Sequence, residues 1–170
     1  ELEQEMEESI RQGKGREEML RSGIQYARAG NYIDFGATNH VEQGQLLELL
    51  HKAGEEEVDG HTFDLMLEDL EKAKELVYLT DNCGEIVADK LLIKILKEQY
   101  PDLHITVIVR GMPVLNDATM ADARAVGLTE LVTVIGNGNG VGGTQINLLS
   151  EEAGKACEAA DLIISKGQGN

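Results

Sequence analysis

The sequence is short of aromatic residues and of positive charge. It has no tryptophan, two phenylalanines and four tyrosines, and its 15 lysines and arginines stand against 31 aspartates and glutamates, a formal net charge of −16. An acidic surface repels phosphate backbones and anionic lipid headgroups, and nucleic-acid bases would find few rings on which to stack. We therefore expect neither a nucleic-acid-binding protein nor a membrane-surface protein.

Long apolar runs, a leader and paired cysteines are also missing. No run approaches the roughly 18 apolar residues of a membrane span, and no basic-then-apolar leader opens the chain, which predicts neither a membrane-spanning nor a secreted protein. The two cysteines, Cys83 and Cys157, form no CxxC and no zinc-ligand spacing. This usage is typical of a reducing compartment, so we expect a cytoplasmic location.

The acidic residues are concentrated at the front of the chain. Residues 1–80 have a net charge of −11 and residues 81–170 a net charge of −5. We interpret most of this charge as solvated surface on a helical front half, which leaves a few carboxylates of the second half free to hold a cation. A length of 170 residues favours one domain.

Two patterns of hydrophobicity divide the chain near Lys74. Residues 1–73 keep helical spacing of apolar residues, which predicts a helical region. Residues 74–170 alternate short β-branched runs with helical patterns, which predicts an α/β core with a mainly parallel sheet whose strands are covered on both faces. The expected strands are Leu76–Leu79, Ile105–Val109, Leu131–Ile135 and Leu162–Ile164, and the expected helices are Glu85–Gln99, Ala118–Val126 and Ser150–Ala159.

Carboxylates and amides follow the first two expected strands. Asp81 and Asn82 come after the first, and Asp117 comes after the second. Ligands gather at the carboxyl ends of strands in open α/β sheets, and hard oxygen donors of this kind suit Mg²⁺ or Mn²⁺. The alternative is that Asp81 and Asp117 are N-caps of the helices that follow them.

Other charged and polar residues near these ends are candidates for substrate contact. Lys166 follows the last expected strand and could reach a phosphate, or it could be a surface lysine. Arg110 could contact an anion or pair with an acid, and Glu85 could act in the site or merely favour the start of its helix. Asn31 and Asp34 lie three residues apart, either on one helical face or at a capped helix end.

The glycine-rich loop Gly136–Gly143 supports a second hypothesis. It contains a literal GxGxxG, which would make the chain a nucleotide- or dinucleotide-binding module with this loop as its anion cradle. The clear helical pattern begins only near Ser150, so a substrate or lid loop accounts for the glycines better. A third hypothesis is a degenerate domain that serves only as an assembly partner.

Four segments, taken together, resemble one known family in their residues and in their order. They are Gly30–Gly36 (GNYIDFG), Asp81–Lys90 (DNCGEIVADK), Val109–Thr119 (VRGMPVLNDAT) and Ala160–Asn170 (ADLIISKGQGN). This chain resembles the metal-dependent damage-control phosphatases, also catalogued as domain of unknown function eighty-nine. The resemblance implies a Rossmann-like, three-layer α/β/α fold with a helical cap. It also implies an enzyme that hydrolyses phosphate monoesters of small metabolites.

The resemblance also implies roles for individual residues. Asp81, Asn82 and Asp117 would hold the catalytic divalent metal, Mn²⁺ or Mg²⁺ with Co²⁺ or Ni²⁺ as further possibilities. Asn31, Asp34 and Lys166 would line the pocket of a small phosphorylated metabolite, and we add Glu85, Arg110 and Asn116 to this set of substrate-binding candidates. Asp81 and Glu85 are the alternatives for the base that accepts a proton from water.

The chain departs from the family pattern in two ways. Smaller, prokaryote-type members usually have an N-terminal CxxC, which is missing here, and the family chain continues beyond the Lys-Gly-Gln-Gly-Asn block that ends at Asn170. We therefore expect the sequence to be most of a larger domain. The substrate and the oligomeric state stay open.

Overall fold

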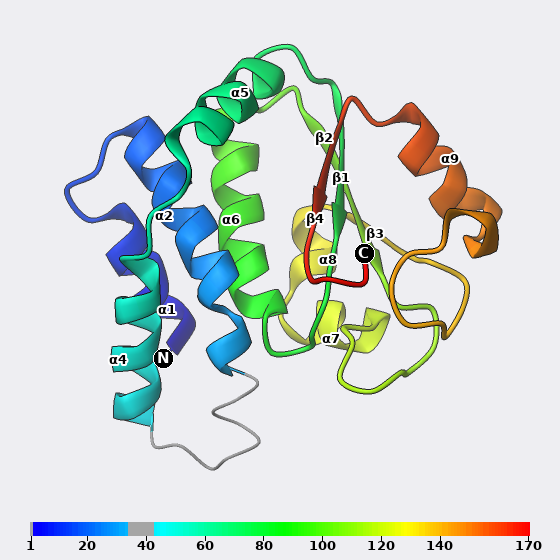
Figure 1. Cartoon of the computed structure of the whole chain (residues 1–170), viewed down its shortest axis with the longest axis horizontal. Coiled ribbons are helices and arrows are strands. Elements are labelled where there is room, and N and C mark those ends of the chain that lie inside the picture. The colour runs from blue at the N-terminus through cyan, green and yellow to red at the C-terminus, as the bar shows by residue number, and fades with distance from the viewer. Residues whose placement is uncertain (1, 34–42) are drawn as a thin grey trace.

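A computed structural model describes residues 2–33 and 43–170 of the chain, and Figure 1 shows its helices and strands. The helical front part has α1 (Leu2–Arg11), α2 (Arg16–Ala29), α4 (Gln43–Gly54) and α5 (Gly60–Leu70). The strands are β1 (Glu75–Leu79), β2 (His104–Val109), β3 (Thr133–Gly136) and β4 (Leu162–Ser165). Between the strands lie α6 (Ile86–Gln99), α7 (Met120–Ala125), α8 (Leu128–Leu131), the 3₁₀ turn η1 (Ile146–Leu148) and α9 (Glu151–Ala159).

The four strands form one parallel sheet in the order β3-β2-β1-β4. At the carboxyl end of β1, Leu79 lies beside Ile108 of β2 and beside Ser165 of β4. The chain therefore builds outward from β1 through β2 to β3 and then returns to the other side of β1. Such a reversal makes a crevice at the carboxyl ends of the two strands that flank it, here β1 and β4.

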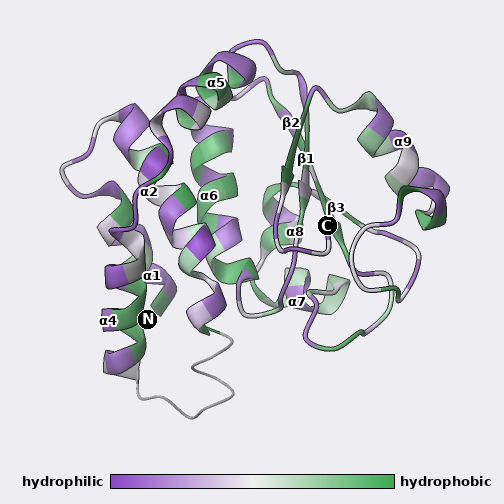
Figure 2. Ribbon diagram, in the orientation of Figure 1, coloured by the Kyte–Doolittle hydropathy of each residue, from purple (hydrophilic) through white to green (hydrophobic). Residues whose placement is uncertain are grey.

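Helices cover both faces of the sheet, with α6 on one side and α9 on the other (Figure 1). The side chains of β1 alternate between two cores as the pleat requires. Leu76 and Tyr78 belong to the larger core, which includes α6 and α2, whereas Val77 and Leu79 belong to a smaller core with α9. Figure 2 shows the mostly hydrophobic strands between helices of mixed hydropathy. The predicted parallel α/β fold is confirmed.

The helices of the front part continue the larger core outward. Helix α2 packs against α6, and α4 packs against α2. Met6 and Leu20 of this part are buried in the same core as Leu76 of β1. The division at residue 73 into a helical cap and an α/β core stays a prediction. No helix of the described part is long and apolar enough to cross a membrane.

Two details of the sheet differ from the sequence-based expectation. The third strand was expected at Leu131–Ile135, but residues Leu128–Leu131 form α8, which starts from Gly127 with φ of 74°. Strand β3 therefore begins only at Thr133. The expectation that all strands are covered on both faces is wrong for β4, because this strand lies at an edge of the sheet and its Ile163 is 44% exposed.

Candidate functional site

The carboxyl edge of the sheet brings most of the predicted site residues together. Asp81 follows β1, Asp117 follows β2, and Lys166 directly follows β4. The segments after β1 and β2 are joined by two backbone hydrogen bonds, from Ala118 N to Asp81 O and from Cys83 N to Asn116 O, each 2.7 Å long. The acidic segments are thus paired beside the crevice between β1 and β4.

The structure rules out the helix-cap alternative for the two aspartates. Helix α6 starts at Ile86 with Glu85 at its N-cap, and α7 starts at Met120 with Thr119 at its N-cap. The N-cap Thr119 shares a capping box with Asp122, a frequent arrangement at helix starts. Neither Asp81 nor Asp117 is needed to begin a helix, so their position at the sheet edge requires another explanation.

Asp81 is a carboxylate without a hydrogen-bond donor among the described residues. Burial raises its pKa, and the negative charges of Glu85 and Asp117 raise it further, although Lys166 and Arg110 oppose them. The backbone at Gly167 lies against this carboxylate: a Cβ there would be 2.4 Å from Asp81 Oδ2, and the φ of Gly167 is +83°. Only glycine satisfies both requirements, so the turn after β4 closes tightly on Asp81.

Arg110 holds the second aspartate. Its Nε donates to Asp117 Oδ2 over 2.7 Å, and its Nη1 donates to the backbone oxygen of Gly143 over 2.5 Å. Arg110 is 6% exposed. The guanidinium therefore fixes one oxygen of Asp117, as the acid-pairing alternative predicted, and ties it to the glycine-rich loop.

Lys166 is not a surface lysine. Its Nζ donates over 2.8 Å to each of three acceptors: Ala27 O, Glu85 Oε2 and Asp89 Oδ1. Burial lowers the pKa of Lys166, but the carboxylates of Asp89 and Glu85 outweigh this effect and raise it. An ammonium has three N–H donors, so all of them are used within the protein.

Asn82 and Glu85 connect Lys166 to the predicted metal ligands. Asn82 Nδ2 donates to Glu85 Oε1 over 2.7 Å and to Asn31 Oδ1 over 3.1 Å. Glu85 is 3% exposed and has one oxygen bound to Asn82 and the other to Lys166. The backbone at Gly30 allows this contact, since a Cβ there would lie 3.1 Å from Glu85 Cα. The end of α2 is therefore a wall of the site.

Two predicted site residues are not placed in this network. The side chain of Asn116 is exposed, and the residue takes part through its backbone oxygen. Asp34 lies outside the described residues. The site thus includes Asn31, Asp81, Asn82, Glu85, Arg110, Asp117 and Lys166 of the predicted set, and their individual roles stay predictions.

Sequence reasoning missed Asp89 and Tyr78. Asp89 is fully buried on α6 and accepts hydrogen bonds at Oδ1 from Lys166 Nζ and from Tyr78 Oη, the latter over 2.6 Å. The signal was its place on a helical face with Ile86 and Ile93, three residues before it and four after it. A carboxylate at a core position is rare unless it is paired.

The glycine-rich loop of the nucleotide-binding alternative is used inside the protein. The amides of Asn139 and Val141 donate to the side chains of Asn137 and Asn139. The next long helix, α9, begins only at Glu151 and is capped by Ser150. The loop therefore lacks the helix start that binds a pyrophosphate, and part of its backbone is engaged in hydrogen bonds within the loop.

The charges of the site suit a divalent cation. Four carboxylates, Asp81, Glu85, Asp89 and Asp117, face the two cations Arg110 and Lys166, which leaves two negative charges. Within residues 2–33 and 43–170 no cluster of three or more Asp, Glu, His or Cys side chains has the arrangement of a metal site. The predicted ligands include only two carboxylates, with the Asn82 amide as third donor. Such a set fits a hard cation that keeps positions for water and substrate.

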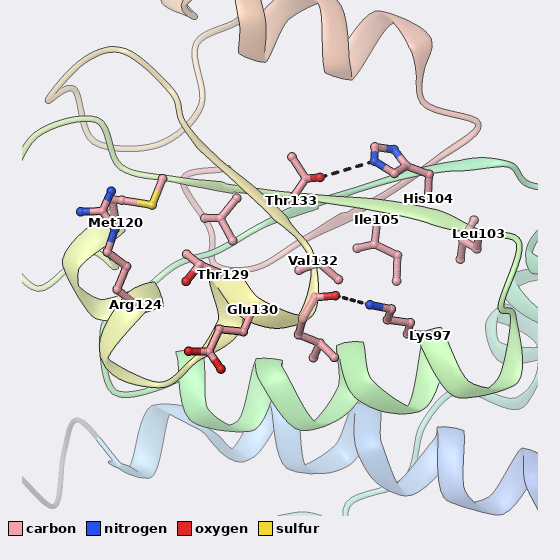
Figure 3. Close-up of a pocket in the computed structure, with 12 residues that line it drawn as sticks. Lys97, Leu103, His104, Ile105, Met120, Arg124, Thr129, Glu130, Val132 and Thr133 are labelled. Atoms are coloured by element: carbon pink, nitrogen blue, oxygen red, sulfur yellow. Dashed lines mark hydrogen bonds between the residues drawn. The ribbon is translucent and has the colours of Figure 1, made fainter.

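Another hollow on the molecule lacks the cluster of carboxylates found at the carboxyl edge of the sheet. It has a volume of about 690 Å³ and lies beside the edge strand β3, where Lys97, His104, Arg124 and Glu130 are among its lining residues (Figure 3). Lys97 is bonded to the Leu131 backbone oxygen, and His104 to Glu75 and Thr133. None of the predicted site residues that the structure describes lines it, so the carboxyl edge of the sheet stays the candidate site.

Comparisons with known proteins identify relatives of this chain. The chain is 35% identical over 164 residues to a protein of Archaeoglobus fulgidus named damage-control phosphatase, covering 92% of this chain and 54% of the relative. It is 33% identical to a damage-control phosphatase of Pyrococcus horikoshii, covering 86% of this chain and 50% of the relative. A third relative, an uncharacterized protein of Methanocaldococcus jannaschii, is 38% identical, covering 90% of this chain and 50% of that protein.

The fold is also found in a solved structure. The crystal structure of a DUF89 family protein from Pyrococcus horikoshii has a TM-score of 0.80 and 30% sequence identity, and the match covers 99% of this chain and 59% of that one. The chain thus spans about half the length of the curated relatives it matches. A family model described as the damage-control phosphatase ARMT1-like domain matches residues 1–170, so the chain belongs to that family.

Proposed function

We propose that this chain provides the site of a divalent-metal-dependent phosphatase that hydrolyses phosphate monoesters of small metabolites. Two relatives are named damage-control phosphatases, which supports the reaction class. The observation that carries the proposal is the excess of two negative charges at the crevice between β1 and β4, with Asp81 free of hydrogen-bond donors among the described residues. A site with this charge attracts a divalent cation, which in turn attracts a phosphate.

The metal would be held by Asp81, Asn82 and Asp117. Mn²⁺ or Mg²⁺ suits these oxygen donors, and Co²⁺ or Ni²⁺ is a further possibility. When bound, the ion would supply positive charge for the phosphate oxygens and a lowered pKa for an attacking water. Arg110 keeps Asp117 turned to the site by occupying one of its oxygens.

Side chains of the site would accept the proton of the water and contact the phosphate. Both oxygens of Glu85 are engaged, whereas Asp81 has free acceptor positions, so Asp81 is the better placed of the two to accept the proton of the water. Lys166 and Arg110 supply the positive charges nearest to the phosphate. A direct contact between Lys166 and phosphate would replace its bond to the neutral Ala27 oxygen.

The test measures release of inorganic phosphate from a panel of sugar phosphates with Mn²⁺, with Mg²⁺ and with chelator. We expect release only with metal, and a loss of about 1,000-fold in kcat/KM for Asp81→Asn and for Asp117→Asn, equivalent to about 4 kcal/mol of transition-state stabilisation. The matched control is Glu151→Gln, which removes an exposed carboxylate from α9. Full activity in chelator, or in Asp81→Asn, would contradict the proposal.

A further inference from the structure

The most deeply buried charged group of the site is one for which the proposed reaction has no use. Asp89 is fully buried, and both donors to it, Tyr78 Oη and Lys166 Nζ, bind the same oxygen, Oδ1. The other oxygen, Oδ2, has no hydrogen-bond partner in the part of the chain that the structure describes. A buried carboxylate with an unsatisfied oxygen is costly, because water would have solvated it.

Charge pairing with Lys166 does not require both carboxylates. Lys166 Nζ lies 2.8 Å from Glu85 Oε2 and 2.8 Å from Asp89 Oδ1, so one ammonium faces two buried carboxylates. One buried negative charge is therefore in excess, and a buried charge without a full counter-charge destabilises a fold. Replacing Asp89 by a neutral side chain of the same shape should therefore leave the fold at least as stable as before.

Hydrogen bonds lead from Asp89 to a predicted metal ligand. Tyr78 donates to Asp89 Oδ1, and Lys166 donates to the same Asp89 oxygen and to Glu85 Oε2. Glu85 Oε1 in turn accepts from Asn82 Nδ2. The direction of these hydrogen bonds is fixed at Lys166, Asp89 and Glu85, since an ammonium only donates and a carboxylate only accepts.

The last bond in this chain decides which way the Asn82 amide faces. A carboxylate oxygen can bind only the NH₂ end of the amide, so Glu85 turns the nitrogen toward itself and Asn31 supports the same orientation. The amide oxygen, Oδ1, is then the end left for a cation. A flipped amide would present N–H donors, which repel a cation.

We propose that Asp89 is a positioning residue for the metal site, acting with Tyr78 through Lys166 and Glu85 to hold the Asn82 amide with its oxygen toward the cation. This inference rests on the proposed metal site. Outer groups that orient ligands typically change metal affinity by 10- to 100-fold when they are altered.

The experiment measures Mn²⁺ affinity directly, from the electron paramagnetic resonance signal of free Mn²⁺, with no substrate present. We expect Asp89→Asn to weaken Mn²⁺ binding about 10-fold while its thermal midpoint without metal is unchanged or higher. Tyr78→Phe, which keeps every charge, should weaken binding by a smaller factor of about 3. The matched control is Ile93→Val, buried on the same helix, which should lower the midpoint and leave the affinity unchanged.

A double-mutant cycle separates positioning from simple loss of charge. If Asp89 acts through Glu85, then Glu85→Gln combined with Asp89→Asn should weaken binding little more than the stronger single variant does. If the double variant loses Mn²⁺ affinity by the product of the two single losses, the two charges act independently and the inference is overturned. Wild-type affinity in Asp89→Asn would also overturn it. Wild-type affinity in Asp81→Asn, or no Mn²⁺ binding by the parent chain, would overturn the proposed metal site as well.

Discussion

An aspartate lies at each edge of the sheet, and the two differ in their hydrogen bonds and in the direction in which their pKa is shifted. At the amino edge of the sheet, Asp161 Oδ2 accepts hydrogen bonds from the amides of Lys74 and Glu75 over 2.8 and 3.0 Å. These backbone donors lower the pKa of Asp161. At the carboxyl edge, Asp81 has no donor among the described residues, and burial together with neighbouring carboxylates raises its pKa.

The ionised carboxylate of Asp161 stabilises the folded state, whereas that of Asp81 destabilises it. A lowered pKa means that the folded state favours the charged form of Asp161, and a raised pKa means that it disfavours the charged form of Asp81. Residues that cost stability in the absence of a ligand are expected where function requires them. The raised pKa of Asp81 thus favours the carboxyl edge as the functional edge of the sheet.

Among the variants that test this contrast between the two edges, the largest effect is expected from closing the space beside Asp81. Gly167→Ala places a methyl group 2.4 Å from Asp81 Oδ2 and forces alanine into a positive φ. Displacing Asp81 by a fraction of an ångström to make room should lower phosphatase activity by about 100-fold. The matched control is Gly127→Ala, whose φ is +74° with no atom within 4 Å of the new Cβ. Its thermal midpoint should fall, while its activity stays normal; equal activity loss in both variants would contradict the assignment.

Next in size is a gain of stability on removing the charge of Asp81. Because its pKa is raised, the cost of ionising Asp81 is fully present above that pKa and absent below the usual value near 4. Without metal, Asp81→Asn should therefore raise the thermal midpoint at pH 7 by about 2 °C, with the gain disappearing toward pH 4. Calorimetry in chelator across this pH range measures it, and a midpoint below that of the parent at pH 7 would count against the interpretation.

The opposite sign is expected for Asp161 at the amino edge. Its lowered pKa means that the ionised carboxylate contributes stability above the usual value, and that this contribution is lost as the pH falls through the lowered pKa. Asp161→Asn should lower the midpoint at pH 7, less than Asp81→Asn raises it, and leave phosphatase activity intact. The same calorimetric series serves both variants, so two shifts of equal sign would refute the contrast between the edges.

The smallest effect is expected in the hollow beside β3. Arg124 lines this hollow, and the residues proposed for catalysis do not. Arg124→Ala should leave kcat/KM within about a factor of 2 and the midpoint within about 1 °C, as is usual for surface substitutions. Phosphate release and thermal melting suffice as measurements, and a tenfold loss of activity would place part of the site at β3.

Most of the strands could be predicted because short runs of aliphatic and β-branched residues are typical of the buried strands of a parallel sheet. The expected runs Leu76–Leu79 and Ile105–Val109 match β1 and β2 to within one residue at each end. The third run failed at its start, since Leu131 and Val132 have strand-like composition while Gly127 opens the short helix α8 instead. The local pattern of apolar residues does not show whether Leu131 belongs to the helix that ends there or to the strand that follows.

The candidate site could be predicted where its residues directly follow strands. It could not be predicted where a residue's role depends on whether its side chain is buried. Asp81, Asp117 and Lys166 each follow a strand, so sheet topology alone brings them together. Whether Lys166 is exposed or buried depends on α2, which is distant in sequence and supplies the Ala27 oxygen. Asp89 shares a helical face with Ile86 and Ile93, which indicates a core position, but only the folded structure shows that it binds Lys166 and Tyr78.

The bond between Lys166 and Ala27 has a consequence for how the protein matures. It joins residues 139 positions apart, and the other partners of Lys166, Glu85 and Asp89, are 81 and 77 positions away. Contacts of such long sequence separation form late in folding, after the intervening segments are ordered. A chain still emerging from the ribosome therefore has no assembled site until β4 joins β1, and the proposed metal affinity would report that step.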